Sequence, residues 1–265
     1  MSTGAPCALF GFCLLAAVYP WTGTASTWRE DFASGRLDPA RWQQTLDGDF
    51  RTRSTDVVAS NVGAGYRLRL VADTRGTRDD IVKHFGIGSR CAVSLRPDGL
   101  LHVIIDWGPP PNGSYLAASV ILSPNAVASD PTATRDWFSV GYVGVPPGHN
   151  ARLLVTASAG GVVRTLYADG WPDRNRQGRS IERAEIDIAW RGTSLQIREN
   201  GRLVHTAAAA EILFSSAHVY LQLSSHSNYP ARAVHFENLR VRHGDDSSPV
   251  TGFPSAPNCD VAGAK

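Results

Sequence analysis

The stretch ERAEIDIAWRGTSLQIRENGRLVH, residues 182–205, decides the fold class. Apolar and polar residues alternate through 183–190, 194–199 and 202–206, and a period of two is typical of strands with one buried face. Asn200-Gly201 separates the last two segments and favours a type I′ hairpin turn. The stretch therefore predicts consecutive antiparallel strands.

The same alternation continues along the chain from about residue 28. Short turn-forming segments rich in Gly, Pro, Asn and Asp separate the runs, and no segment has a long amphipathic helical pattern. Many short strands without helices predict an all-β protein, a sandwich or a barrel. Further strands are expected at 56–60, 66–72, 86–94, 100–106, 115–122, 138–143, 151–157, 162–167, 217–223 and 233–242.

The composition is that of a globular protein with little net charge. Of 265 residues, 43% are hydrophobic and 19% charged, which is typical of a packed core rather than of disorder. Basic residues number 26 and acidic residues 24, for a net charge of +2. Because this balance gives no strong field, nucleic acid and anionic membranes are not expected partners.

The first 28 residues contain no charged side chain. Residues 7–21 are mostly apolar, and Gly23-Thr24-Ala25 supplies the small residues that a signal peptidase reads. We therefore expect a signal peptide over 1–25 and a secreted or periplasmic protein; a lipoprotein anchor at Cys13 is a minor alternative. The apolar run is short for a membrane span. The β domain is expected over 26–243, followed by a flexible Ser-, Pro- and Gly-rich tail over 244–265.

Two of the four cysteines, Cys7 and Cys13, fall within the expected signal peptide. Cys91 and Cys259 remain in the mature chain. In a secreted protein they could form one disulfide that ties the tail to the domain, or they could be two unpaired thiols.

Three stretches carry a family resemblance: WREDFASGRLDPARW at 28–42, SLQIRENGRLVH at 194–205 and VHFENLRVR at 234–242. They resemble bacterial secreted concanavalin A-like lectin/glucanase sandwiches of the LamG-like jelly-roll type. The resemblance implies a jelly roll of two antiparallel sheets, with the first and last strands adjacent and a concave face that commonly binds glycans. Because this fold also hosts glycosidases, lyases and inert modules, function must be argued from the site.

The segment EIDIAW, residues 185–190, almost matches a catalytic motif of this superfamily, in which some glucanases carry Glu-x-Asp-x-(x)-Glu on one strand. Glu185 and Asp187 match the first two places, but Ala189, or Trp190 if a bulge is allowed, takes the third. A retaining mechanism needs two carboxyl groups about 5–5.5 Å apart. The segment therefore favours a core strand with its two acidic side chains facing outward.

A structural calcium ion is the one cofactor that the sequence suggests, since hard cations prefer clustered carboxylates. Arg75, Arg78 and Lys83 are interleaved with the first candidate group and favour ion pairing instead. The candidate ligands are Asp73, Asp79 and Asp80, or, across the terminal strands, Glu30 or Asp31 with Glu237 or Asn238.

Three polar, aromatic stretches are candidate carbohydrate-binding sites, because sugars pack on aromatic rings and bond to planar polar groups. Each could instead stabilise a turn, and Arg232 could pair with Glu237. The candidates are Asp106, Trp107, Asn112 and Tyr115; Trp171 and Asp173; and His226, Asn228, Tyr229 and Arg232.

The first functional hypothesis is a secreted, lectin-like protein whose partner is a polysaccharide. The second is a glycoside hydrolase or polysaccharide lyase with a different active site, using Asp80, Asp106, Asp173 or His226. The third is a structural or adhesive envelope domain without activity. The sequence leaves the glycan and the oligomeric state open.

Overall fold

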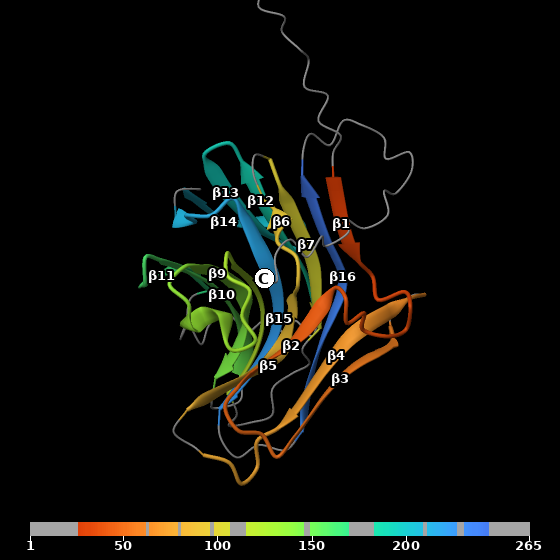
Figure 1. The fold of residues 1–265 in the computed structure, drawn as a ribbon. Coiled ribbons are helices and arrows are strands. Elements are labelled where there is room, and N and C mark those ends of the chain that lie inside the picture. Colours follow the sequence, from red (N-terminus) through yellow and green to blue (C-terminus); the bar gives the residue numbers. More distant parts are fainter. Residues whose placement is uncertain are drawn as a thin grey trace, which may run out of the picture.

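The computed structural model describes residues 26–61, 64–78, 81–95, 98–106, 115–145, 149–169, 183–208, 211–226 and 231–243. This part of the chain is built of strands, with one short 3₁₀ helix, η1 (Pro131–Ala133). The strands form two antiparallel sheets that pack face to face (Figure 1). The expected two-sheet antiparallel sandwich is therefore confirmed. Across the described residues, no helix has the length and apolar character needed to cross a membrane.

Sheet A contains the two ends of the described chain. Its first and last strands pair antiparallel along their length, so that the expected adjacency of the chain ends is confirmed. The strand order is β14-β13-β12-β7-β16-β4-β3, with β1 beside β16. The strands are β1 (Ser26–Glu30), β3 (Thr52–Ala59), β4 (Tyr66–Asp73), β7 (Leu100–Asp106), β12 (Arg183–Arg191), β13 (Ser194–Glu199), β14 (Arg202–Ala208) and β16 (Arg232–His243).

Sheet B has the order β11-β10-β9-β8-β15-β5-β2, with the short β6 beside β15. Its central strands come from distant parts of the chain, since β15 lies between β8 and β5. The strands are β2 (Trp42–Asp47), β5 (Val82–Ser89), β6 (Val93–Ser94), β8 (Tyr115–Ser123), β9 (Trp137–Val145), β10 (His149–Ala159), β11 (Val162–Ala168) and β15 (Ser216–His226).

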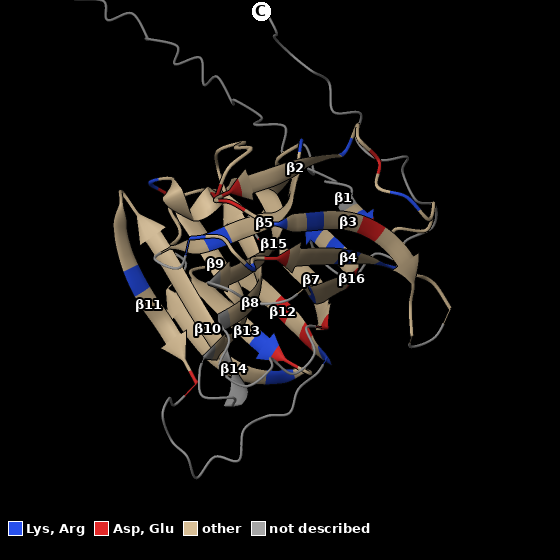
Figure 2. Ribbon diagram, turned by 90° about the horizontal axis from the view of Figure 1, so that it is seen from below, with Lys and Arg blue, Asp and Glu red and all other residues tan. Residues whose placement is uncertain are grey.

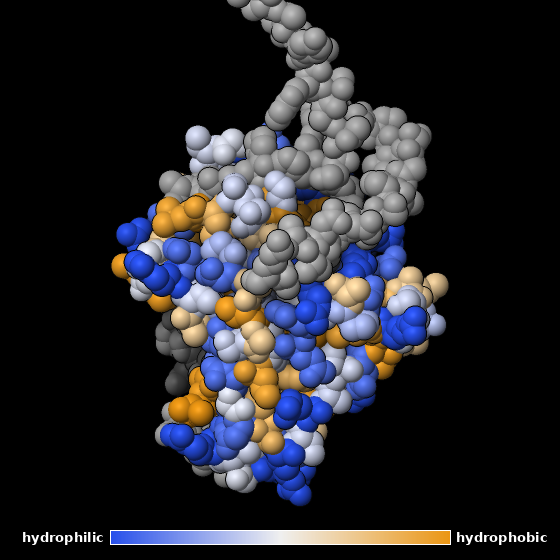
Figure 3. Space-filling view, viewed as in Figure 1, coloured by the Kyte–Doolittle hydropathy of each residue, from blue (hydrophilic) through white to orange (hydrophobic). Residues whose placement is uncertain are grey.

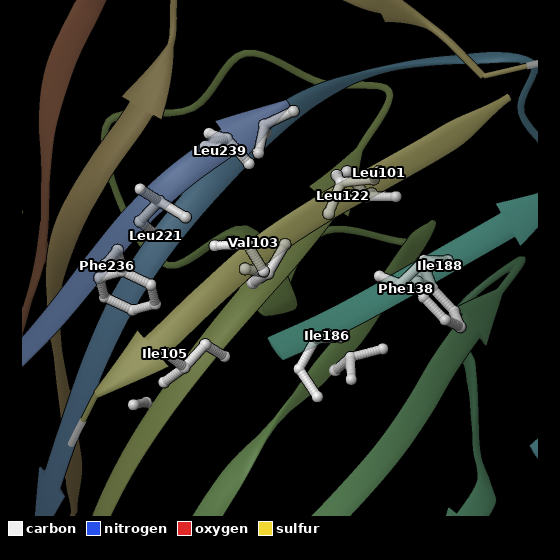
Figure 4. Packing of buried hydrophobic residues seen from close by; sticks show 14 of the residues in the cluster. Leu101, Val103, Ile105, Leu122, Phe138, Ile186, Ile188, Leu221, Phe236 and Leu239 are labelled. Atoms are coloured by element: carbon white, nitrogen blue, oxygen red, sulfur yellow. The ribbon is translucent and has the colours of Figure 1, made fainter. Parts of the chain in front are cut away.

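The core lies between the sheets and consists of alternate residues from their inner faces. Val103 and Ile105 of β7 and Phe236 of β16 pack toward Leu122 of β8 and Leu221 of β15 (Figure 4). Fully burying such a side chain contributes about 1.5–3 kcal/mol, so this layer is the main source of stability. On the outside, hydrophilic and hydrophobic residues are interspersed over the side of the molecule seen in Figure 3.

The Asn200-Gly201 turn has the expected conformation. Asn200 and Gly201 have φ values of 49° and 77°, both in the left-handed region that a type I′ turn requires. The turn joins β13 and β14, which pair antiparallel. The hairpin expected at this site is confirmed.

The strand expected at 86–94 was wrong in its limits. β5 begins at Val82 and ends at Ser89, and β6 follows as a separate two-residue strand. The alternation is hidden because Lys83 occupies an inward position with 0% exposure, where its ammonium donates to Arg78 O and lies 3.8 Å from Asp49 Oδ1. Strand β2 was not expected, β1 was expected only as the first strand that the resemblance places beside the last, and β15 continues to His226, three residues beyond its expected end.

Candidate functional site

Two of the three candidate stretches are bounded by strand termini that lie at one end of the sandwich, the lower end in Figure 1. Tyr115 on β8 and His226 on β15 are Cα partners across neighbouring strands of sheet B. In sheet A, Asp106 on β7 is the partner of His235 on β16 and of Arg183 on β12. Side chains are described for Asp106 and Arg232, and the backbone alone for Tyr115 and His226. Trp107, Asn112, Trp171, Asp173, Asn228 and Tyr229 lie outside the described residues.

Asp106 belongs to a charged group on the outer face of sheet A, which we call the Arg67 cluster: Arg67, Asp106, Arg183 and Glu237. Arg67 Nη1 lies 2.6 Å from Asp106 Oδ2 and 4.0 Å from Glu237 Oε1. Arg183 Nη2 lies 3.4 Å from Glu237 Oε2, and both Arg67 and Glu237 are 6% exposed. The two guanidinium groups and the two carboxylates neutralise each other, so Asp106 is held in an ion pair.

The suggested pairing of Arg232 with Glu237 was wrong, because Glu237 pairs with Arg67 and Arg183 instead. Arg232 and Glu237 are five positions apart on one strand, and an odd spacing places two side chains on opposite faces. Arg232 Nε is buried without a hydrogen-bond partner among the described atoms, and burial lowers the pKa of its guanidinium.

The glucanase-like segment forms a core strand, as expected. Ile186 and Ile188 of β12 are fully buried, whereas Glu185 is exposed. Asp187 is held by His102 of β7, whose Nδ1 lies 2.7 Å from Asp187 Oδ1. Ala189, at the third place of the motif, is 5% exposed and has no acidic group. The segment therefore lacks the carboxylate that the motif carries at its third place.

The outer face of sheet B differs in character. Strands β8, β9 and β15 contain no Lys, Arg, Asp or Glu, so they carry neither the blue nor the red that marks charged residues in Figure 2. A Cβ on Gly86 would lie 2.2 Å from Leu221 O, and one on Gly141 would lie 2.4 Å from Ala118 O, so these positions require glycine. The floor of this face is made of small residues: Gly86, Ala117, Ser119, Ser139 and Gly141.

A group of hydrogen-bonded polar side chains lies on this face, which we call the His84 cluster: His84, Asp130, Gln222 and Ser224. His84 Nδ1 lies 2.9 Å from Ser224 Oγ and 2.8 Å from Gln222 Nε2. Gln222 Nε2 also donates to Asp130 Oδ1 at 3.2 Å, and His84 Nε2 lies 3.5 Å from Asp130 Oδ2. Because the amide donates to Nδ1, this network assigns the neutral ring proton to Nε2, facing Asp130.

Gln222 retains an unused hydrogen-bond acceptor. Its side chain is 2% exposed, and its Oε1 has no partner among the described atoms. Leaving a buried polar group unsatisfied costs about 1–3 kcal/mol. A ligand hydroxyl that donated to this oxygen would recover that free energy.

Alternation along β15 links the His84 cluster to the Tyr115–His226 pair. Positions 220, 222, 224 and 226 follow one another on the same face of the strand. On the other side of Gln222 from His226, Tyr220 Oη donates to Asn125 O at 2.6 Å and accepts from Val127 N at 2.9 Å. These two hydrogen bonds fix the 124–136 segment over the sheet. His84, Asp130, Gln222 and Ser224 were not predicted as site residues from the sequence, although Gln222, Ser224 and His226 alternate along one strand.

The proposed calcium ligands are engaged by other groups where the structure describes them. Asp73 Oδ2 accepts from Arg75 Nη2 at 2.6 Å, and Asp79 and Asp80 lie outside the described residues. Glu30 accepts from Trp42 Nε1 and pairs with Arg41, on the inner side of the sheet opposite Leu239. Since Glu237 faces outward, Glu30 and Glu237 do not share one cation. Among the described residues, no group of three His, Cys, Asp or Glu side chains could hold a metal ion.

Cys91 forms a disulfide. The other three cysteines lie outside the described residues, so its pairing with Cys259 stays a prediction.

No family model matches the chain, and no curated protein matches it in sequence. Solved structures do match. They include an endo-β-galactosidase from Clostridium perfringens that releases GlcNAcα1-4Gal (TM-score 0.58, 10% identity, 85% of this chain). The Bacillus licheniformis β-glucanase matches with a TM-score of 0.54, 14% identity, 82% of this chain and 97% of its own length. The CBM2 module of the Lactobacillus casei BL23 phage J-1 evolved Dit protein matches with a TM-score of 0.55, 10% identity, 82% of this chain and 96% of its own length.

These likenesses establish the fold as the concanavalin A-like jelly roll that the sequence resemblance implied. At 10–14% identity they carry the fold alone. The chain spans 64% of the length of the Clostridium perfringens enzyme.

Proposed function

We propose that this is a secreted protein that binds a neutral polysaccharide on the outer face of sheet B, without cleaving it. The observation that carries the proposal is the His84 cluster, with the buried and unpartnered Gln222 Oε1, beside a floor of small residues. An amide, an imidazole and a hydroxyl within hydrogen-bond distance of one another match the mixed donors and acceptors of sugar hydroxyls.

The small floor supports the same proposal. Gly86 and Gly141 carry no side chain beside Gln222, so no bulky group at these two positions stands between a sugar hydroxyl and the His84 cluster. Tyr115 and His226 are Cα partners further along β8 and β15, on the side of the sheet that strand alternation assigns to the His84 cluster. The fold also hosts carbohydrate-active proteins, including the β-glucanase and the endo-β-galactosidase named above, which is consistent with a glycan ligand.

Binding is favoured over hydrolysis because Asp130 is committed to structural contacts. Its Oδ1 accepts from Thr132 N and from Gln222 Nε2, and its Oδ2 accepts from Thr132 Oγ1. Asp47 is the one acidic residue of the described strands that faces outward beside the cluster, opposite His84 on β2. A retaining hydrolase needs two available carboxyl groups about 5–5.5 Å apart.

The other acids suggested for an enzyme give no alternative centre. Asp106 is paired in the Arg67 cluster, while Asp80, Asp173 and the side chain of His226 lie outside the described residues.

The test is to incubate the full chain with insoluble β-glucans, galactans and xylans, and to follow both depletion of the protein and release of soluble oligosaccharide. We expect depletion without release. Gln222→Leu should weaken retention about tenfold, as expected when one or two buried hydrogen bonds are lost. Gln44→Leu, an exposed glutamine on β2, is the matched control and should retain normal affinity.

Two results would contradict the proposal. Release of oligosaccharide that disappears in Asp47→Asn or Asp130→Asn would show a hydrolase. A protein that no neutral glycan depletes would favour the structural or adhesive envelope domain.

A further inference from the structure

A small cavity lies on the outer face of the other sheet, between β7 and β16. It has a volume of about 110 Å³ and is lined by Leu100, His102, Arg240 and Arg242, and we call it the Leu100 pocket. It belongs to sheet A, whereas the His84 cluster lies on the outer face of sheet B. The pocket is therefore distinct from the proposed glycan site.

Arginines concentrate at this pocket. Arg240 and Arg242 alternate on β16 and share its outer face, about 6–7 Å apart along the strand. Across the strand pair, Arg240 is the direct Cα partner of Arg29 on β1. Like charges directly opposite each other destabilise a sheet.

Nearby carboxylates are already paired with other groups. Asp31 lies 3.2 Å from Arg29, and Asp187 lies 2.7 Å from His102. Arg240 Nε donates to Asn238 Oδ1 at 2.8 Å, and within the described part of the chain no carboxylate lies within ion-pair distance of its guanidinium. Burial lowers the pKa of Arg240, and the neighbouring Arg29 and Arg242 lower it further, while the carboxylate of Asp31 raises it. An anion at this place would stabilise the charged guanidinium.

The remaining side chains hold the pocket in shape. His102 is fixed between Asp187 and Asn238, whose Nδ2 lies 3.4 Å from His102 Nε2. Leu100 and the methylene stems of the arginines supply an apolar wall. Asp187, the second residue of the glucanase-like segment, thus positions a wall of this pocket.

The size of the pocket limits the ligand. A water molecule occupies about 30 Å³ in the liquid, so a cavity of about 110 Å³ accommodates a few waters. That is the scale of a sulfate or carboxylate group with its attached carbon, and the rest of a sugar chain would lie outside.

We propose that the Leu100 pocket binds an anionic substituent of an acidic polysaccharide, a sulfate ester or a uronate carboxylate. Arg240 and Arg242 donate charge-assisted hydrogen bonds to its oxygens, and Leu100 contacts the adjoining carbon. That the anionic group belongs to a polysaccharide rests on the proposed function. That the pocket prefers an oxyanion rests on the residues of the pocket alone.

The test measures binding of the full chain to dextran sulfate, polygalacturonate and neutral dextran by affinity electrophoresis at one ionic strength. Arg240→Gln and Arg242→Gln should each weaken binding of the charged polymer five- to tenfold. Arg240→Lys should weaken binding less than Arg240→Gln does, because lysine keeps the positive charge but lacks the paired N–H donors of the guanidinium group. Arg53→Gln, which removes one exposed arginine from β3, is the matched control and should change binding less than twofold.

The outcomes separate the sources of the anion. Binding of dextran sulfate alone identifies a sulfate ester, and binding of polygalacturonate alone identifies a uronate; either result supports the pocket if Arg240→Gln weakens it. The proposal is overturned if neither polymer binds, if Arg240→Gln binds normally, or if Arg53→Gln loses as much affinity. If insoluble neutral glycans do not retain the protein, the proposed function is contradicted, but the effect of Arg240→Gln on binding of the charged polymer still tests the Leu100 pocket.

Discussion

The two outer faces of the sandwich use polar residues in opposite ways. On sheet A, acidic and basic side chains are abundant and mostly paired with each other, as in the Arg67 cluster and the His102–Asp187 pair. On sheet B, the central strands carry no charged residue, and the His84 cluster gathers amide, imidazole and hydroxyl groups over small side chains.

The comparison shows that conspicuous charges can be structural, while the proposed ligand site lies on the face whose central strands carry no charged residue. Glu185, Asp187 and Asp106 stand out in the sequence as candidate catalysts, yet Asp187 is hydrogen-bonded to His102 and Asp106 is held in an ion pair with Arg67. Gln222 and Ser224 match no sequence motif. They are nevertheless hydrogen-bonded to each other, and Gln222 Oε1 is a buried acceptor without a partner among the described atoms. Four predictions test whether the two faces divide these roles.

The largest effect is expected from Glu237→Ala on sheet A. The change removes the carboxylate that Arg67 and Arg183 share, while Asp106 stays 2.6 Å from Arg67, which is 6% exposed. Removing one partner of a buried ion pair typically destabilises by about 3–5 kcal/mol, and because Asp106 remains we expect the lower part of this range. Urea unfolding measures the loss.

Glu211→Ala is the control for this substitution, because Glu211 pairs with Arg164, whose side chain is 61% exposed. An exposed pair contributes about 0–1 kcal/mol. Equal losses in the two variants would mean that the Arg67 cluster is no more structural than a surface pair.

The next effect is expected from Gly86→Ala on sheet B. The new Cβ would lie 2.2 Å from Leu221 O, a backbone atom that cannot move without disturbing β15. Overpacking of this kind costs about 1–3 kcal/mol. Thermal unfolding measures it, with Thr52→Ala on exposed β3 as a control. A harmless Gly86→Ala would show that the floor of this face is not close-packed.

A smaller, pH-dependent effect is expected from Arg75→Gln. Hydrogen bonds and charge from Arg75 hold the pKa of Asp73 below its ordinary value of 3.8. A lowered folded-state pKa contributes stability that is present above the unfolded pKa and lost as pH falls through the folded one. Wild type should therefore exceed the variant by a constant amount at neutral pH, and the two should converge below about pH 4. Urea titrations between pH 2 and 7 test this, and a gap that does not narrow as the pH falls below about 4 would contradict it.

The smallest effect is expected from Asp187→Asn. The His102 and Asp187 side chains are 19% and 27% exposed, and partly exposed ion pairs contribute about 0–1 kcal/mol. Retention on neutral glycan should be unchanged, because the pair lies on sheet A. Loss of a polysaccharide-cleaving activity in this variant would instead restore the glucanase-like segment as a catalytic motif.

Local sequence patterns predicted most of the strands and the hairpin, because alternation and turn chemistry depend on neighbouring residues. Asn200 and Gly201 adopt the left-handed conformations that their residue types favour. The prediction failed where the pattern was interrupted. Lys83 at an inward position, and Gly86 and Gly88 at outward ones, concealed the true limits of β5.

The candidate site was predicted only in part. Tyr115 and His226 were named from separate stretches, and sheet pairing placed them side by side. Asp130 and His84 could not be found, because they lie far from Gln222 in sequence and meet it only through the packing of a loop and a neighbouring strand. Arg232 was assigned a partner by proximity in sequence, although the pleat directs it to the other face.

The sequence by itself determined the β architecture, the inward and outward positions of strands such as β12, and the absence of an acid at the third place of the glucanase-like motif. Only the tertiary structure decided which charges neutralise each other, which polar groups remain unpartnered, and where arginines line a cavity. The reason is physical: strand periodicity is a local property of the backbone, whereas ion pairs and sites depend on contacts between residues that folding brings together.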